Sequence, residues 1–173
     1  RRLTPPLAQL PVNAQGTSVI VGNTAVPVPW EQRGDRIGLA DLPLMHHLGL
    51  DLQNSTTAEQ QPVVWFSDEG AFLPTWFSDG HRYLDLTSWA AQRGWQLTPN
   101  GSSLRVQAPI GTVSAGRRGQ QEWGDRLVLD VDRPVLWSFD EDATAFTLTV
   151  QARPGSSFDP EALTSGEGNE LKS

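Results

Sequence analysis

The chain has 173 residues, which is enough for one domain or for two or three small ones, and 38% of them are hydrophobic, which is low for one large core. Its net charge of −7 excludes the concentrated positive surface that nucleic acid requires, and it disfavours binding to an anionic membrane surface. The absence of cysteine excludes disulfides, zinc–thiolate sites and thiol catalysis, and no apolar stretch approaches the ~20 residues needed for membrane insertion.

The first part of the chain divides into a lead-in and a small module. Residues 1–16 are rich in proline and carry no periodic pattern, so we predict a flexible lead-in. The first module covers residues 17–62 and begins with a hairpin, because Gly22-Asn23 supplies the backbone angles of a tight turn. Its polar last part, residues 53–62, is expected to be a loop or linker.

A short helix is predicted inside this first module. Asp41 is a good N-cap because its carboxylate can accept the free amide hydrogens of a first helical turn. Leu42, Met45 and Leu48 recur at helical spacing, and Gly49 can end the helix.

A second module with similar elements is predicted over residues 63–108. Its helix is capped by Thr87 or Ser88 and stopped by Gly94. The Asn100-Gly101 pair then predicts a hairpin between two alternating strands.

Helical signals vanish after this point. Residues 109–153 are predicted to form an antiparallel β module, although Gly111 to Gly119 suggests a mobile loop. Residues 154–173 carry few apolar side chains and are expected to be a linker or disordered tail that leads to something further downstream. The expected fold class is therefore α+β: two small strand–helix–hairpin modules followed by an antiparallel β module.

One short pattern occurs three times, each time as glycine, a variable residue and arginine before an apolar run. The copies are Gly34-Asp35-Arg36, Gly80-His81-Arg82 and Gly124-Asp125-Arg126, spaced 46 and 44 residues apart. Such repetition indicates a chain assembled from small modules. Each arginine starts a strand after a turn, so pairing with an acid or capping of carbonyls is favoured over ligand binding.

The sequence predicts no catalytic residue, no metal site and no cofactor. His46 and His47 are adjacent on a helix, so their side chains diverge, and His81 lies in a turn. No Gly-x-Ser-x-Gly motif or phosphate-binding loop occurs. Convergence of two carboxylates in a glycosidase-like pair stays open, and the candidates are Asp68, Glu69, Asp79 and Asp85.

The seven tryptophans are the residues most suited to ligand binding, because aromatic faces stack on sugar rings. Trp65, Trp95 and Trp137 lie in strand patterns and are expected in the core. Trp30, Trp76 and Trp123 flank turns, so both burial and exposure stay open for them. We take Trp76, Trp123 and Arg82 as the candidate ligand-binding residues.

Two resemblances follow from the quoted motifs. Residues 78–97, SDGHRYLDLTSWAAQRGWQL, with Leu104-Arg105-Val106, resemble the copper amine oxidase N-terminal-like module, and residues 18–52 look like a first copy of it. Despite the family's name, the chain has no copper ligand set. The segment GDRLVLDVDRP, residues 124–134, is similar to AMIN-type β modules of exported cell-envelope proteins.

The whole arrangement, over roughly residues 15–152, resembles the N-terminal region of cyanobacterial exported proteins of the phosphodiester glycosidase family. The resemblance implies an extracytoplasmic location in the periplasm or cell envelope. The expected function is a non-catalytic accessory region that binds or positions peptidoglycan or an envelope polysaccharide. One alternative is the N-terminal part of a phosphodiester glycosidase, with its own downstream catalytic domain as partner. Another is a protein–protein scaffold module, which an exposed strand edge would indicate.

Overall fold

The computed structural model describes residues 6–66 and 70–164. The start of the expected lead-in, the end of the expected tail and the candidate carboxylates Asp68 and Glu69 lie outside these ranges. The chain divides into two compact units. Unit 1 contains Arg1–Pro109 and Leu136–Val150, and unit 2 contains Ile110–Val135 and Gln151–Ser173.

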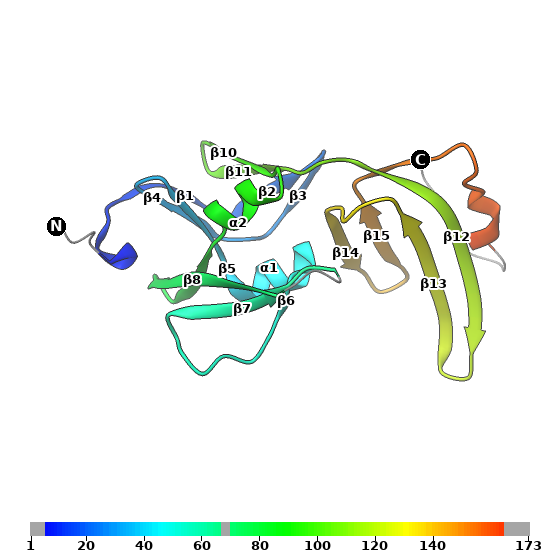
Figure 1. Ribbon diagram of the computed structural model, residues 1–173, viewed down its shortest axis with the longest axis horizontal. Coiled ribbons are helices and arrows are strands. Elements are labelled where there is room, and N and C mark those ends of the chain that lie inside the picture. The colour runs from blue at the N-terminus through cyan, green and yellow to red at the C-terminus, as the bar shows by residue number, and fades with distance from the viewer. Residues whose placement is uncertain (1–5, 67–69, 165–173) are drawn as a thin grey trace. The chain divides into compact units, whose positions relative to one another are not determined.

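The expected α+β class is wrong, because the described chain is 53% strand and 13% helical and consists of several mostly antiparallel sheets. Figure 1 shows the two α-helices of the described residues as short elements among many strands. The local patterns identified both helices. However, eight and six residues are too few for a helical layer, and the strands between them pair with one another instead.

Most strands of unit 1 form one seven-stranded antiparallel sheet. Its order is β1 (Val12–Gly16), β4 (Trp30–Arg33), β5 (Arg36–Ala40), β9 (His81–Asp85), β8 (Ala71–Ser78), β7 (Gln60–Val64) and β6 (Asp51–Leu52). The sheet thus joins strands from both predicted modules. Part of the predicted lead-in is an edge strand, because main-chain pairing with β4 orders it without any side-chain pattern.

A four-stranded sheet places the two predicted hairpins side by side. The first hairpin is β2 (Ser18–Val21) with β3 (Thr24–Val26), and the second is β10 (Gln96–Asn100) with β11 (Ser103–Gln107). Strands β2 and β11 pair in parallel, so the sheet order is β10-β11-β2-β3. Both predicted hairpins are therefore present, and they also connect the two predicted modules.

The helix α1 (Asp41–Leu48) buries a different face from the one its spacing suggested. Leu44 and Leu48 are fully buried, whereas Leu42 and Met45 are exposed by 64% and 40%. Ala40 stands at the N-cap without a side-chain bond, and Asp41 begins the helix instead. The second helix, α2 (Thr87–Gln92), buries Trp89 and Ala90.

The main core of unit 1 contains three tryptophans in edge-to-face contact. The ring centroids of Trp65, Trp89 and Trp95 lie 4.9 to 5.8 Å apart, and each side chain is at most 5% exposed. Trp65 and Trp95 thus lie in the core, as predicted. Such edge-to-face pairs add stabilisation beyond the buried area, so this cluster anchors α2 between the sheets.

The hairpin of β14 (Trp137–Glu141) and β15 (Phe146–Val150) belongs to unit 1, although it was expected in the third module. The Trp137 ring lies against Gly49, the residue that ends α1 in the left-handed conformation. The chain therefore leaves unit 1 after Pro109, returns with this hairpin and leaves again.

Unit 2 is built around a long two-stranded ribbon. Strand β12 (Gly111–Gln121) pairs antiparallel with β13 (Gly124–Val131), and the first residues of β12 also pair in parallel with β16 (Ala152–Pro154). The short 3-10 helix η2 (Pro160–Leu163) places Leu163 against Gly116. The segment that was expected to be a mobile loop is thus part of a strand, and part of the expected tail is ordered by the contact of Leu163 with Gly116. Another short 3-10 helix, η1 (Leu7–Gln9), precedes β1 in unit 1.

Candidate binding site on the β12–β13 ribbon

The first two arginines of the repeat are used inside the fold, as the structural interpretation predicted. Arg36 donates from Nε to Asp85 at 2.7 Å, and Arg82 donates from Nε to Asp41 at 2.8 Å. Arg82 also donates to the side-chain oxygen of Gln61. The guanidinium of this candidate ligand-binding residue is therefore engaged on two sides within unit 1.

The candidate residue Trp76 lies in the interior of unit 1. Its side chain is 2% exposed and stacks on Tyr83, with ring centroids 5.9 Å apart. Gly38 lies so close to the ring that a Cβ there would be 2.4 Å from it. Trp76 has no open ring face for a sugar. It also lies on the opposite face of the sheet from Arg82, because Trp76 pairs with Tyr83 and Phe77 with Arg82.

A buried ion pair explains why Trp76 is held inside. Glu31 is 1% exposed, and its Oε2 accepts hydrogen bonds of 3.0 Å from both Trp76 Nε1 and Arg33 Nε. The remaining Arg33 nitrogens donate to the carbonyls of Ala8 and Leu10 and to the hydroxyl of Ser78. This network fastens the N-terminal segment to the sheet.

The network also shifts the pKa of two acids. Burial opposes ionisation of Glu31, but hydrogen bonds from Ser78, Trp76 and Arg33 and the Arg33 charge together hold its pKa below the ordinary value of 4.5. Burial, followed by the charges of Glu31 and Asp79, raises the pKa of Tyr83 to about 12. The hydrogen-bond donors and acceptors of this network are thus all engaged in contacts within unit 1.

The two adjacent histidines of α1 lie against each other. His46 and His47 contact each other edge to face at 4.8 Å, and burial, together with the His46 charge, lowers the pKa of His47. Within residues 6–66 and 70–164, no group of three or more His, Asp or Glu side chains could hold a metal ion. In the same ranges, no helix is long and apolar enough to cross a membrane.

The third candidate residue, Trp123, is in a different environment. It lies in the turn between β12 and β13, because the strands close with Gln121 opposite Gly124. Its side chain is 77% exposed, the highest value among the large hydrophobic residues described. Of the three candidate ligand-binding residues, Trp123 alone presents an open ring.

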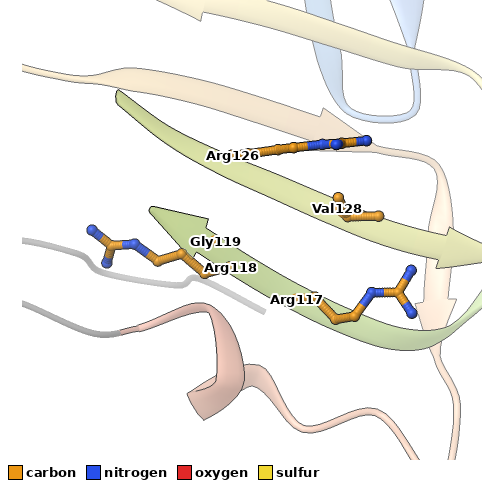
Figure 2. Close-up of a pocket in the computed structure, with 5 residues that line it drawn as sticks. All are labelled: Arg117, Arg118, Gly119, Arg126 and Val128. Carbon is orange, nitrogen blue, oxygen red and sulfur yellow. The ribbon is translucent and has the colours of Figure 1, made fainter. Parts of the chain in front are cut away.

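A groove of about 350 Å³ lies on the same ribbon and is lined by Arg117, Arg118, Gly119, Arg126 and Val128. Figure 2 shows the arginine side chains of β12 and β13 around it. The register explains the groove: Arg117 lies opposite Val128 and Gly119 opposite Arg126, so these four positions share one face. Gly119 has no side chain, which leaves space beside Arg126.

The arginines of the groove differ in how they are held. Arg117 donates to Asp130 at 2.8 Å while its side chain stays 64% exposed. Arg118 lies on the other face, where it pairs with Asp125. Arg126, the third arginine of the repeat, has no ion pair or hydrogen bond with any other described side chain. The repeat therefore has two structural arginines and one that stays available.

Sequence reasoning missed this groove because Gly111 to Gly119 was interpreted as a loop. The signal that could have revealed the groove is the apolar run of β13, because a strand needs a partner strand. The segment directly before Trp123 is the nearest stretch of sequence that can pair with it in an antiparallel hairpin. A strand there places Arg117 and Gly119 on one face.

No protein-family model matches the sequence, and no curated protein matches it either. Among solved structures, a hypothetical protein from Synechocystis has a TM-score of 0.72 and 34% sequence identity over 82% of this chain. The chain spans only 27% of the length of that protein. The likeness extends over most of the fold described here, and the neighbour is cyanobacterial.

Proposed function

We propose that this chain is a non-catalytic accessory region that binds or positions a cell-envelope polysaccharide, including peptidoglycan, through the β12–β13 ribbon. The observation that supports this is the open Trp123 side chain at the tip of the ribbon. A large exposed aromatic ring contributes little to folding, and its flat apolar face suits the apolar face of a sugar ring.

The groove behind the tip supplies the polar part of the proposed site. Arg117 and Arg126 each carry guanidinium donors on the same face, and both side chains are exposed. Guanidinium donors bind hydroxyl and carboxylate oxygens of sugars. The proposal thus combines one stacking residue with two hydrogen-bonding residues on a single hairpin.

An extracytoplasmic location is part of this proposal. It is supported by the resemblance to exported envelope proteins, and the cyanobacterial structural neighbour is compatible with it. The proposal assigns no catalytic role to any residue of the chain.

Isothermal titration calorimetry with soluble peptidoglycan fragments and envelope polysaccharides tests the proposed site. We expect saturable binding that Trp123→Ala weakens at least about tenfold, equivalent to about 1.4 kcal/mol. The matched control is Phe146→Ala, which removes an aromatic side chain that is 59% exposed in unit 1. Absence of binding, or binding that Trp123→Ala leaves unchanged, would contradict the proposal.

A second candidate function, a protein–protein scaffold, is favoured by a separate observation. Strand β13 lies at the edge of its sheet, whose order is β13-β12-β16. An edge strand offers unpaired main-chain groups to a strand of another molecule. Sedimentation analysis of the chain alone is the first test of this candidate.

A further inference from the structure

The outer edge of β13, which pairs with no other strand of the described residues, carries a sequence that is complementary to itself. Its middle part runs Arg126-Leu127-Val128-Leu129-Asp130, so an arginine and an aspartate stand at equal distances from Val128. We propose that two copies of this chain pair through β13, antiparallel and about a two-fold axis at Val128. The proposal rests on the scaffold candidate and names its partner as a second copy.

With the two-fold axis at Val128, opposite charges lie beside each other at both ends of the five-residue segment 126–130. Arg126 of one copy lies opposite Asp130 of the second copy, and the symmetry repeats this pair. Side chains directly opposite in an antiparallel pair have Cβ atoms about 4.5–5.5 Å apart, and opposite charges there stabilise the pairing. Arg126 has no described partner within its own chain, so it is available for this contact.

The two registers that differ by one residue lack this complementarity. A shift by one residue, with the axis between Leu127 and Val128, brings Asp125 opposite Asp130, which is a repulsive pair. A parallel in-register pairing places Arg126 beside Arg126 and Asp130 beside Asp130. The charges therefore favour the antiparallel arrangement centred on Val128 over the one-residue shifts and over the parallel pairing.

The apolar residues support the same register. Leu127 is 47% exposed, and the two-fold places it beside Leu129 of the second copy on the ribbon face opposite Val128. Pairing would remove part of this exposed apolar surface from water.

The other strand of the ribbon is a poor edge for pairing. Residues 116–119 of β12 are Gly, Arg, Arg and Gly, and consecutive arginines with glycines oppose edge-to-edge contact. The two edges of the ribbon thus differ, and β13 is the one whose sequence allows association.

Self-association should depend on concentration. A single strand pair makes a small interface, below the ~1,200 Å² of stable complexes, so we expect a dissociation constant in the micromolar range or weaker. Sedimentation velocity of the full chain, from about 1 µM to about 1 mM, covers this range.

Charge reversal gives the decisive comparison. Arg126→Asp and Asp130→Arg should each raise the dissociation constant at least about tenfold, because each places like charges opposite each other. The double variant restores both intermolecular pairs and should dimerise again. It does not restore the Arg117–Asp130 pair within one chain, so rescue reports the contact between copies.

The matched control is Arg133→Asp, which makes the same charge change at a residue that is outside β13 and whose side chain is 53% exposed. It should leave the dissociation constant unchanged. A monomer over the whole concentration range, a dimer insensitive to Arg126→Asp, or a double variant that stays monomeric would each overturn the proposal.

A covalent reporter tests the axis itself, because the chain has no cysteine of its own. Val128→Cys places two thiols opposite each other at the two-fold axis, where opposite Cβ atoms lie about 4.5–5.5 Å apart, so a small approach of the two strands brings them to the separation of about 3.5–4.5 Å in a disulfide. Oxidation should crosslink this variant rapidly, and Gln120→Cys, an exposed position on β12, should crosslink slowly. Equal crosslinking rates would contradict the axis. Polysaccharide titration of Trp123→Ala, which changes no residue of the proposed contact between copies, scores the glycan proposal independently.

Discussion

Replacement of Gly49 by alanine tests how the returning hairpin is held on unit 1. Gly49 ends α1 with a φ of +72°, and a Cβ at this position would lie 2.2 Å from Cε2 and 2.3 Å from Cζ2 of Trp137. Two costs are therefore expected: about 1–2 kcal/mol for the left-handed backbone and about 1–3 kcal/mol for displacing the packed ring.

Gly80→Ala provides the matched control. Gly80 has a φ of +79°, but no described atom lies within 4 Å of an added Cβ. Gly80→Ala should therefore cost only the backbone part, and the difference between the two variants measures the packing of Trp137 on the end of α1. We expect this difference to be about 1–3 kcal/mol.

Urea unfolding followed by tryptophan fluorescence is a suitable assay, because all tryptophans except Trp123 belong to unit 1. A double-mutant cycle with Trp137→Ala completes the experiment. In that background, Gly49→Ala should cost no more than Gly80→Ala, because the clashing ring is gone. Equal costs of the two glycine substitutions in the natural background would refute the packing of β14 on α1.

Three further predictions concern the buried network and the candidate tryptophans. Glu31→Gln leaves Arg33 buried without its counter-charge and should cost about 3 kcal/mol in urea unfolding at neutral pH. Because the pKa of Glu31 in the folded protein lies below 4.5, ionised Glu31 stabilises the folded state fully above pH 4.5, and this stabilisation is lost as the pH falls through the folded pKa. The free energy of unfolding of Glu31→Gln should therefore depend less on pH in this acidic range. Ultraviolet titration of Tyr83, the one tyrosine of the chain, should show a midpoint of about 12 in the folded protein and about 10 in urea, and stability should fall as the pH rises between these values. Trp76→Ala should cost about 3–5 kcal/mol, whereas Trp123→Ala should change stability by less than about 0.5 kcal/mol, and equal thermal shifts would contradict this difference.

The sequence predicted the local features of the fold well. The hairpins at Gly22-Asn23 and near Gly101 and the end of α1 at Gly49 are all present. Each depends on backbone angles that only a few residue types adopt, so a short stretch of sequence determines it.

Helix orientation was less predictable. In α1, Leu42, Met45 and Leu48 fit helical spacing, but Leu44 and Leu48 fit it as well. An eight-residue helix has too few turns for the spacing to distinguish these faces. The neighbouring strands decide the outcome, and Leu44 became buried.

The candidate site could be predicted only in part. Trp76 and Trp123 both flank turns in the sequence, yet one is 2% and the other 77% exposed. Trp76 is enclosed by Tyr83, by Gly38 and by the buried carboxylate of Glu31, which come from three different strands. Such an enclosure depends on strand pairing, which turn patterns do not reveal. Trp123 stays open because the ribbon ends there.

The repeat explains why two predicted modules became one unit. In the pairing of β5 with β9, Gly38 lies opposite Asp85 and Ala40 opposite Tyr83, so the two copies run antiparallel across a local axis. The arginine of each copy then reaches an acid in the other copy: Arg36 reaches Asp85 and Arg82 reaches Asp41. Because neither copy contains the acid that its own arginine binds, neither is complete alone. The third copy has no counterpart across such an axis within the described chain, and its arginine, on β13, is therefore the one that remains for an external contact.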